Sequence, residues 1–390
     1  MLPLKLALRN LLGAGIRSWL NIFVLSLAYV AIIWHQGMLE GWNRQARQDT
    51  INWEIGGGQI RHIQYDPYDP FTLDSANATL SESLREAVSR SQMVPVLVWP
   101  GTAYFNGNML GVLIKGIPAG QKIVALPTDS LRSNRELPAV ILGQQMADLL
   151  GVTEGDFITL RWRNRYGAMD ARDFRVACIF TTQVPTVDAG QVWLDLDTLY
   201  GMLGAEKIAT YLVCRPGHAV ADLPPGWIFY STDALLSDLD EIIRQKSVGG
   251  MVFYGLLLAL AFLAIFDTQV LNIFRRRKEI GTLIALGMPR SMVIFQFTLE
   301  GALHAILAAL LAAIYGIPLL AWQAKMGIAM PKGSQNYGLA IGERIFPYYS
   351  VGLVVLTVFL VCASAFLVSY LPARKISGIQ PTEALRGRVR

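Results

Sequence analysis

Residues 274–301 read FRRRKEIGTLIALGMPRSMVIFQFTLEG, a short basic segment between two long apolar runs. The four consecutive basic residues, Arg275 to Lys278, resist transfer across a membrane, whereas both flanking runs are apolar enough to enter one. We therefore expect this segment to lie at the cytoplasmic surface of a membrane. Its position makes it a candidate contact point for a cytoplasmic partner.

The composition is typical of a membrane protein. Of the 390 residues, 53% are hydrophobic and 16% charged, and the mean hydropathy is +0.38. An α-helix needs about 20 apolar residues to cross the hydrocarbon core, and four runs are long enough: 19–38, 248–274, 292–322 and 346–371. The expected fold class is an α-helical membrane protein with four transmembrane helices plus a mixed α/β two-lobed extracytoplasmic domain between helices 1 and 2.

The first apolar run resembles a signal peptide because basic residues precede it. Its apolar core is too long for one, however, and no A-x-A cleavage pattern follows Ile33, so we expect it to be retained. Leucines recur on one helical face of residues 1–18, which predicts an amphipathic helix at the cytoplasmic interface. A simple basic flank is the alternative for that segment.

Charge placement predicts the orientation of the chain. Basic residues outnumber acidic ones by three to none in 1–18, five to one in 275–290 and five to one in 374–390. Residues 39–246 carry 18 basic and 24 acidic residues. The positive-inside rule therefore puts both termini in the cytoplasm and the large domain outside. The same distribution argues that the excess positive charge reflects topology and not nucleic-acid binding.

The region between the first two apolar runs is long enough for a folded domain of one or two lobes. Its alternating strand and helix patterns include a hairpin turn at Asn106-Gly107. The helix predicted at 233–247 should continue into the second apolar run without a linker, as a stiff stalk. The predicted domains are 1–18 amphipathic interface helix; 19–38 transmembrane helix 1; 39–246 extracytoplasmic α/β domain, with a β-rich inner lobe about 119–188; 248–274 transmembrane helix 2; 275–290 cytoplasmic coupling segment; 292–322 transmembrane helix 3; 323–345 extracytoplasmic loop; 346–371 transmembrane helix 4; and 372–390 cytoplasmic tail.

Motifs for catalysis, nucleotide binding and metal binding are missing from the sequence. It contains no G-x-x-x-x-G-K-[ST], G-x-S-x-G, H-E-x-x-H or paired C-x-x-C motif, and its four histidines lack metal-ligand spacing. The acidic residues Asp238, Asp240 and Glu241 are better explained by a solvated helix face than by a metal site. We expect no catalytic, cofactor-binding or metal-binding residues here, and ATP on a separate subunit. Cys178 and Cys214 are expected to be buried free thiols, with a disulfide between them as the alternative.

Two acidic residues, Asp267 and Glu300, lie inside apolar runs. A charged side chain is costly in lipid, so we expect both to face the helix bundle. Hydrogen bonding between helices is the favoured role. A proton or ion relay is the alternative, and His304 is the group nearest in sequence that could take part in one.

The residues after Lys278 predict a short helix. EIGTLIALG places Ile280, Leu283 and Ile284 on one face and ends at Gly287, a residue suited to a left-handed helix cap. Pro289 follows at a position that tolerates proline at the start of the next helix. The segment therefore predicts a short cytoplasmic helix joined rigidly to the second and third spans.

At this point the sequence resembles the MacB/FtsX/LolC superfamily of ABC transporter permeases, also called type VII, and especially its LolC/LolE-like members. RRRKEIGTLIALG and the Glu300-Gly301 pair are similar to the family's R-x-x-E-I-G-x-L-x-A-L-G segment and the glutamate-glycine pair that follows it. YLPARKISGIQPTEALR is similar to the family's C-terminal ending, and LALRNLL to the helix before its first span. Asp267 departs from the asparagine often found near that position.

The resemblance implies a non-catalytic, multi-pass subunit of a bacterial inner membrane. Its implied partners are a dimer of cytoplasmic ABC ATPase subunits, a second permease of the same or a related chain, membrane lipid, a lipoprotein or lipid substrate, and an extracytoplasmic carrier, with no nucleic acid. The implied coupling helix would seat on the ATPase. Its implied coupling residues are Lys278, Glu279, Ile280, Gly281, Leu283, Ile284, Leu286 and Gly287.

The resemblance favours a permease that converts ATP-driven motion into extraction or expulsion of a lipidated or hydrophobic substrate, with lipoprotein release as the best single prediction. The alternatives are an FtsX-like transducer that activates an extracytoplasmic partner, and a MacB-like efflux component. A membrane-anchored binding protein without energy coupling is the interpretation that needs no family resemblance.

Overall fold

The computed structural model describes residues 16–132, 138–218, 223–329 and 344–378. The chain divides into two compact units. The membrane unit comprises Met1–Trp42, Ile242–Ile328 and Ile345–Arg390, and the sheet domain comprises Asn43–Glu241 with Ala329–Arg344. The predicted interface helix at 1–18 and the cytoplasmic tail at 372–390 lie mostly outside the described residues.

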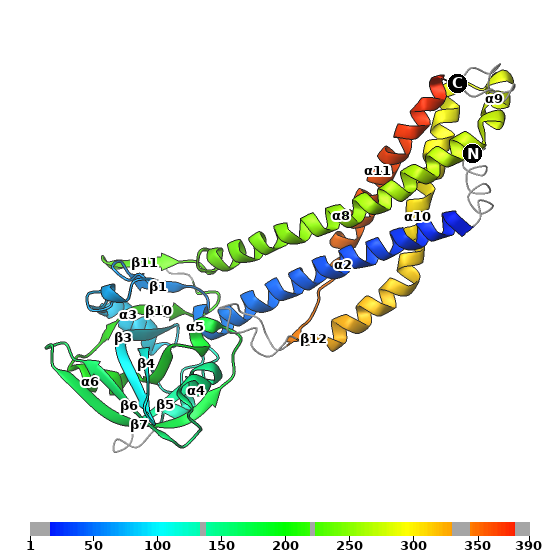
Figure 1. The fold of residues 1–390 in the computed structure, drawn as a ribbon. Coiled ribbons are helices and arrows are strands. Elements are labelled where there is room, and N and C mark those ends of the chain that lie inside the picture. Colours follow the sequence, from blue (N-terminus) through cyan, green and yellow to red (C-terminus); the bar gives the residue numbers. More distant parts are fainter. Residues whose placement is uncertain (1–15, 133–137, 219–222, 330–343, 379–390) are drawn as a thin grey trace. The chain divides into compact units, whose positions relative to one another are not determined.

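Among the described residues, four helices are long and apolar enough to cross a membrane (Figure 1). They are α2 Ile16–Thr50, α8 Ser237–Arg275, α10 Arg290–Met326 and α11 Val351–Arg374. The short helix α9, Arg277–Ala285, lies between α8 and α10 in the chain. The first two spanning helices extend well beyond the apolar runs 19–38 and 248–274, because polar residues continue the helical backbone past each run. The boundary between the two units falls inside both of these helices.

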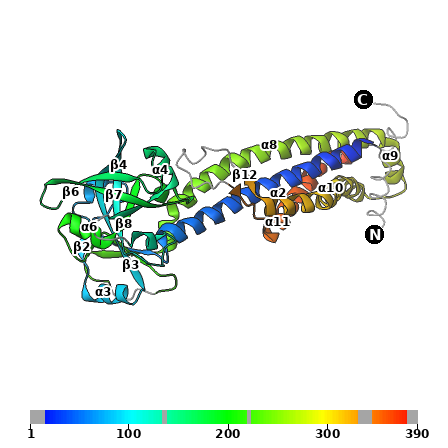
Figure 2. The same cartoon turned by 90° about the horizontal axis from the view of Figure 1, so that it is seen from below.

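The membrane unit has an apolar core to which all four long helices contribute, and α10 and α11 lie side by side (Figures 1 and 2). The core contains Ile22, Leu25, Tyr29, Ala261, Ile265, Leu303, Ala305, Ala308, Ala312, Val361 and Ala365. Much of the remaining helix surface is apolar and exposed, as expected where lipid replaces water.

Glycines let segments of the membrane unit approach closely at two places. On α2, a Cβ at Gly37 would lie 2.2 Å from the Tyr349 ring, and one at Gly41 would lie 2.1 Å from the carbonyl oxygen of Phe346. On α10, a Cβ at Gly301 would lie 2.1 Å from Oγ of Ser369 on α11. Small residues commonly permit such close contacts between membrane helices.

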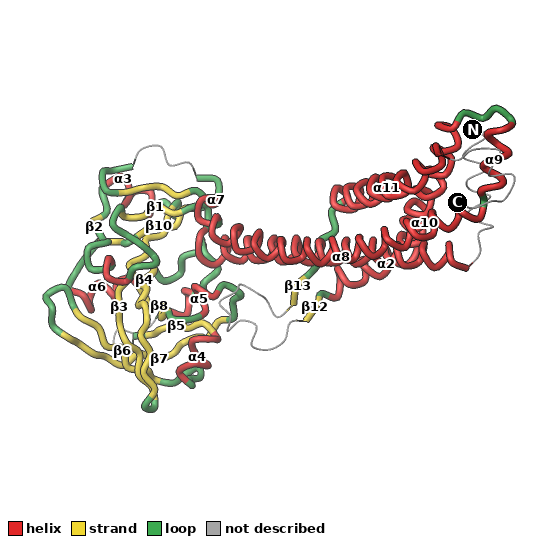
Figure 3. Tube along the Cα trace, turned by 45° about the horizontal axis from the view of Figure 1, so that its top comes forward, coloured by secondary structure: helices red, strands yellow, loops and turns green. Residues whose placement is uncertain are grey.

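The sheet domain is built on a nine-stranded sheet (Figure 3). Its strand order is β11-β1-β10-β3-β4-β8-β5-β7-β6, and β3 also pairs with β6. The strands are β1 Gln59–His62, β3 Met93–Phe105, β4 Asn108–Ile117, β5 Ala139–Gly143, β6 Phe157–Arg163, β7 Met169–Phe180, β8 Gln191–Asp195, β10 Tyr211–Cys214 and β11 Trp227–Tyr230. The second pairing of β3 closes β3, β4, β8, β5, β7 and β6 into a six-stranded barrel.

The barrel has its own apolar core. Residues from every barrel strand alternate inward, as the pleat of a strand requires, and helices α4 Gln144–Leu150 and α6 Leu196–Leu203 add Leu150 and Leu199 to this core. The range predicted for the β-rich lobe, about 119–188, is therefore too short. The barrel begins at Leu97 of β3 and ends at Asp195, because β3, β4 and β8 complete its wall.

The remaining strands extend the sheet from the first half of β3. Met93 to Val96 pair antiparallel with β10, which pairs with β1, which pairs with β11. Helix α3, Glu82–Ser89, lies near β3 and contributes Leu84 to a second apolar cluster with Ile60, Leu212 and Trp227. The smaller elements are η1 Ile51–Ile55, η2 Pro70–Thr72, β2 Ala78–Thr79, η3 Thr128–Leu131, α5 Pro185–Asp188, β9 Ile208–Ala209, α7 Thr232–Leu235, β12 Ile328–Ala329, β13 Arg344–Ile345 and η5 Lys375–Gly378.

The hairpin predicted at Asn106-Gly107 is present. Phe105 pairs with Asn108, and Asn106 and Gly107 adopt φ of 47° and 86°. Two positive φ values are what a two-residue hairpin turn of this type requires. Cys178, Cys214 and Cys362 are all free thiols in the structure.

Candidate coupling site

Helix α9 is amphipathic, and its apolar face is turned inward. Ile280 and Gly281 are buried, and Leu283 and Ile284 are half-buried. They pack with apolar residues from the end of α8, the start of α10 and the end of α11 with η5. The cluster comprises Ile273, Ile280, Leu283, Ile284, Met288, Val293, Ile294, Phe297, Ala373 and Ile376. The short helix is therefore fixed to the ends of three membrane helices.

The opposite face of α9 is exposed. It carries Lys278, Glu279, Thr282, Ala285 and Leu286, and the Leu286 side chain is 80% exposed. A largely exposed leucine at a helix end, surrounded by polar groups, is a candidate contact for another protein. We call these five residues the outer face of α9.

The predicted coupling residues are thus divided between two faces. Lys278, Glu279 and Leu286 lie on the outer face, and Gly287 is exposed just beyond it, whereas Ile280 and Gly281 point into the membrane unit. Thr282 and Ala285 also lie on the outer face, but the predicted coupling residues do not include them. The helical period of 3.6 residues places them opposite Ile280 and Leu283, so the sequence contained the signal. The inward residues can support the position of α9 but cannot themselves touch a partner.

The turn after α9 has defined geometry. Gly287 adopts φ of 91°, in the left-handed region that favours glycine. The Met288 backbone N–H donates to the Leu283 carbonyl oxygen at 3.1 Å, which closes the last turn. Pro289 is the N-cap of α10, so the helix begins one residue later, at Arg290, than the sequence predicted.

Arg276 links α9 to α10 through two carboxylates. Its Nε and Nη2 donate to the Glu279 carboxylate at 2.6 and 2.5 Å, and its Nη1 donates to Oε2 of Glu300 at 3.0 Å. Its guanidinium also lies 4.9 Å from the centre of the Phe297 ring. The hydrogen bonds with Glu279 raise the pKa of Arg276 and lower the pKa of Glu279, so both stay charged at neutral pH.

The two intramembrane acids have different surroundings. The Glu300 side chain is only 3% exposed and is paired with Arg276. Asp267 is exposed on α8, contrary to the expectation that it would face the helix bundle. Its neighbours Ile265 and Gln269 take the buried positions on α8, and successive helical residues lie about 100° apart.

His304 is buried one turn from Glu300, and its Nδ1 lies 3.0 Å from the Glu300 backbone carbonyl oxygen. This contact ties His304 to the helix backbone, whereas a relay would need a contact with the carboxylate. Within the described ranges, no three His, Cys, Asp or Glu side chains lie close enough together to hold a metal ion.

Lys115 is a second buried charged group, and no motif in the sequence predicts its burial. It lies on β4 in the sheet domain, with its Nζ 4.9 Å from the Trp193 ring centre and 5.9 Å from that of Tyr211. Burial lowers the pKa of its ammonium to about 8. A lysine among strand residues is usually expected on the solvent face, so its burial could not be anticipated.

Comparisons with known proteins match the C-terminal part of the chain and, at lower identity, about two thirds of it. Residues 251–381 match a family described as FtsX-like permease C-terminal. The chain is 23% identical over 294 residues to the lipoprotein-releasing system transmembrane protein LolC of Xylella fastidiosa strain Temecula1, covering 68% of each chain. LolC of strain 9a5c is 22% identical over the same length.

Two solved structures are similar to part of the chain. The periplasmic region of MacB from Actinobacillus actinomycetemcomitans is 11% identical with a TM-score of 0.32, covering 48% of this chain and 94% of that one. The extracellular domain of the ABC-type transporter YknZ from Gram-positive bacteria is 15% identical with a TM-score of 0.27, covering 42% and 84%.

Proposed function

Because the chain is an FtsX-like ABC transporter permease of the MacB/FtsX/LolC type, we propose that it transmits ATP-driven motion from a cytoplasmic ATPase to its extracytoplasmic domain. The main support for this proposal is that α9 is amphipathic, with one buried face and one exposed face. Its inner face is packed into the ends of α8, α10 and α11, and its outer face leaves Leu286 free for a partner. A force applied to the outer face would therefore move all three helices.

Helix continuity supports this proposal. Helix α8 runs without interruption from Ser237 to Arg275 and ends one residue before Arg276, which anchors α9. An uninterrupted helix resists bending better than a loop, so displacement at one end reaches the other. The helix therefore suits mechanical transmission.

The partners follow from the same proposal. ATP binds and is hydrolysed on a pair of separate ABC ATPase subunits, and the chain itself is non-catalytic. The permease works beside a second permease of the same or a related sequence. The basic segment around α9 and both termini face the cytoplasm, and the sheet domain lies on the outer side of the bacterial inner membrane.

We propose that the substrate is lipidated or hydrophobic, with lipoprotein release as the specific case. Support comes from the name of the relatives, a lipoprotein-releasing system protein, at 23% and 22% identity. An extracytoplasmic carrier would then receive the released substrate. An FtsX-like transducer of a signal and an efflux component remain the alternatives.

Copurification tests the coupling site. The detergent-solubilised chain, isolated from its own membranes, should recover an ABC ATPase identified by its P-loop peptides. Leu286→Asp should lower that recovery at least tenfold, because a carboxylate would replace the exposed apolar contact. Leu149→Asp is the matched control, since Leu149 is also an exposed leucine on a helix but lies in the sheet domain. Equal recovery from both variants would contradict the assignment of α9.

A release assay tests the substrate. Vesicles holding the permease, its partner and the copurified ATPase should transfer a fluorescent triacylated lipoprotein to a soluble acceptor only when ATP is present. ATP hydrolysis without any transfer would reject lipoprotein release. Activation of an added extracytoplasmic hydrolase in the same vesicles would instead favour the FtsX-like transducer.

A further inference from the structure

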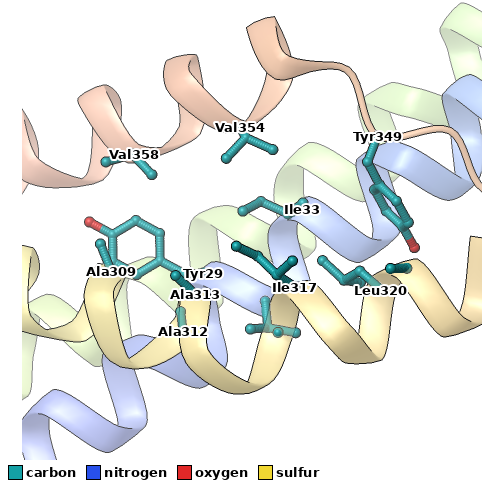
Figure 4. A pocket seen from close by; sticks show the side chains of 13 residues that line it. Tyr29, Ile33, Ala309, Ala312, Ala313, Ile317, Leu320, Tyr349, Val354 and Val358 are labelled. Atoms are coloured by element: carbon teal, nitrogen blue, oxygen red, sulfur yellow. The ribbon is translucent and has the colours of Figure 1, made fainter.

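The membrane unit contains an apolar cavity of about 260 Å³ between α2, α10 and α11 (Figure 4). It lies toward the end of these helices that is remote from α9, since its lining includes residues near the start of α11 and the later half of α10. It is lined by Tyr29, Val30, Ile33, Ala309, Ala312, Ala313, Gly316, Ile317, Leu320, Ala321, Tyr349, Val354 and Val358.

Small side chains on one face of α10 create this space. Ala309, Ala312, Ala313 and Gly316 recur with the spacing of a single helical face, so no large side chain fills the gap between the helices. The cavity wall is closed on one side, because a Cβ at Gly316 would lie 2.8 Å from Cγ2 of Val30 on α2. The helices therefore touch at one wall and separate beside it.

The cavity opens toward the surface that would meet the bilayer. Ile317 lines the cavity and is nevertheless 65% exposed, and its neighbour Ile314 is 74% exposed. Pro318 lacks the backbone N–H that would bond to residue 314. Such a proline is expected to bend a helix, and α10 is bent (Figure 1). The bend gives the opening a structural cause.

One polar group at the cavity lacks a partner. Among the described residues, the Tyr349 hydroxyl is buried without a hydrogen bond, whereas the Tyr29 hydroxyl lies 3.4 Å from Sγ of Cys362. Tyr349 reaches from the segment before α11 toward α10 (Figure 4). Its ring is held against Gly37 of α2, and the Tyr348 backbone N–H donates to the Gly37 carbonyl oxygen at 2.8 Å. The hydroxyl is therefore fixed at this site, and leaving it unbonded costs free energy.

We propose that this cavity binds one acyl chain of an ester-linked membrane phospholipid. An apolar cavity of this kind excludes water and accepts apolar ligands, and the apolar groups that surround a membrane helix are lipid acyl chains. The Tyr349 hydroxyl would donate to the ester carbonyl oxygen, which has no donor of its own. The occupied cavity would wedge α10 apart from α11 at the end remote from α9. This site lies within a single chain and does not depend on the proposed function.

Photolabelling of the full-length chain in nanodiscs tests the proposal. The probe is a phospholipid with a diazirine on one ester-linked acyl chain, and adducts are mapped by mass spectrometry. Adducts are expected on cavity residues, chiefly Ile33, Ile317 and Val354. Ala313→Phe should lower them at least fivefold by filling the cavity, and Ala259→Phe, at an exposed alanine of α8 outside the cavity, should leave them unchanged.

Tyr349→Phe supplies a milder test that keeps the ring. It should lower labelling two- to fivefold with the ester-linked probe and leave labelling unchanged with an ether-linked probe, which has no carbonyl acceptor. Labelling that is equal in native protein and Ala313→Phe would overturn the proposal. So would loss of all cavity adducts on addition of an equimolar lipidated peptide, because the cavity would then belong to the cargo.

Discussion

Glu300 and Lys115 are both charged and buried, but the two regions that hold them stabilise charge in different ways. In the membrane unit, Glu300 is paired with Arg276 at 3.0 Å. In the sheet domain, Lys115 faces the rings of Trp193 and Tyr211, and no described carboxylate lies within ion-pair distance of it. In the first region a guanidinium lies beside the buried carboxylate, whereas in the second the buried ammonium lies against aromatic faces. The difference predicts distinct responses to mutation and to pH.

The largest effect is expected from Arg276→Met, which would leave the Glu300 carboxylate buried without its partner. Removing one member of a buried ion pair typically costs about 3 kcal/mol or more. We therefore expect thermal unfolding in detergent to show a clear loss of stability, while Arg275→Met at the exposed neighbouring arginine has little effect.

The double variant Arg276→Met with Glu300→Leu checks the cause. It should recover most of the lost stability, because no unpaired charge remains. A double variant as unstable as the single one would show that the packing of Arg276 on Phe297 matters more than its charge.

A smaller and opposite effect is expected from Lys115→Met. The folded-state pKa is about 8, below the ordinary lysine value of about 10.4. Between these values the unfolded chain binds a proton that the folded chain does not, so native stability rises with pH across that window and is lowest below pH 8. Methionine removes this penalty and should raise the free energy of unfolding at pH 7 by up to about 3 kcal/mol.

Hydrogen exchange of peptides covering β4 and β8 measures this gain in the full chain. The gain should shrink as the pH rises above 8 and should be absent for Lys122→Met, at an exposed lysine in the same domain. A gain that is independent of pH would mean that methionine simply packs better than lysine.

Gly301→Ala tests the close packing of α10 against α11 beside the ion pair of Arg276 and Glu300. The added Cβ would meet Oγ and Cβ of Ser369 at 2.1 and 2.5 Å, so α10 and α11 must separate beside Glu300. Overpacking of this kind costs about 1 to 2 kcal/mol. Gly316→Ala should cost less in the same thermal assay, because its close contact is the end of the Val30 side chain beside a cavity. Equal losses would contradict this distinction between the two glycines.

The smallest effect on stability is expected from Leu286→Asp. Surface substitutions outside special features usually change stability by less than about 0.5 kcal/mol, and Leu286 is 80% exposed. Its melting temperature should therefore match that of the native protein even where binding of the ATPase is lost. A large loss of stability would place Leu286 with the buried residues of the α9 cluster.

The sequence predicted the features that depend on local pattern. The basic run before Ile280 identified the segment that contains α9, and the spacing of Ile280, Leu283 and Ile284 identified its apolar face. The same helical period also assigns Thr282 and Ala285 to the exposed face, opposite the buried residues. The family motif contains residues of both faces, so it does not by itself distinguish the exposed face from the buried one.

Features that depend on distant pairing could not be predicted. The barrel closes because β3 pairs with β6, and these strands lie more than fifty residues apart in the chain. The burial of Lys115 follows from its packing against Trp193 of β8 and Tyr211 of β10, which come much later in the chain. The pairing of Arg276 with Glu300 follows from the turn at α9. Asp267 was expected to face inward on grounds of cost alone, but its position on α8 turns it to the exposed side.

Closure of the barrel has a consequence for how the sheet domain can associate with other chains. A strand recruits a foreign strand only through an unpaired backbone edge. In the described sheet, β6 is last in the strand order, but its backbone pairs with β3. The terminal strand at the other end of the order is β11. Ile228, Phe229 and Tyr230 of β11 are 40%, 38% and 38% exposed. The pairing of β3 with β6 thus removes a free edge from the barrel end of the strand order, and β11 is the terminal strand at which a foreign strand could add.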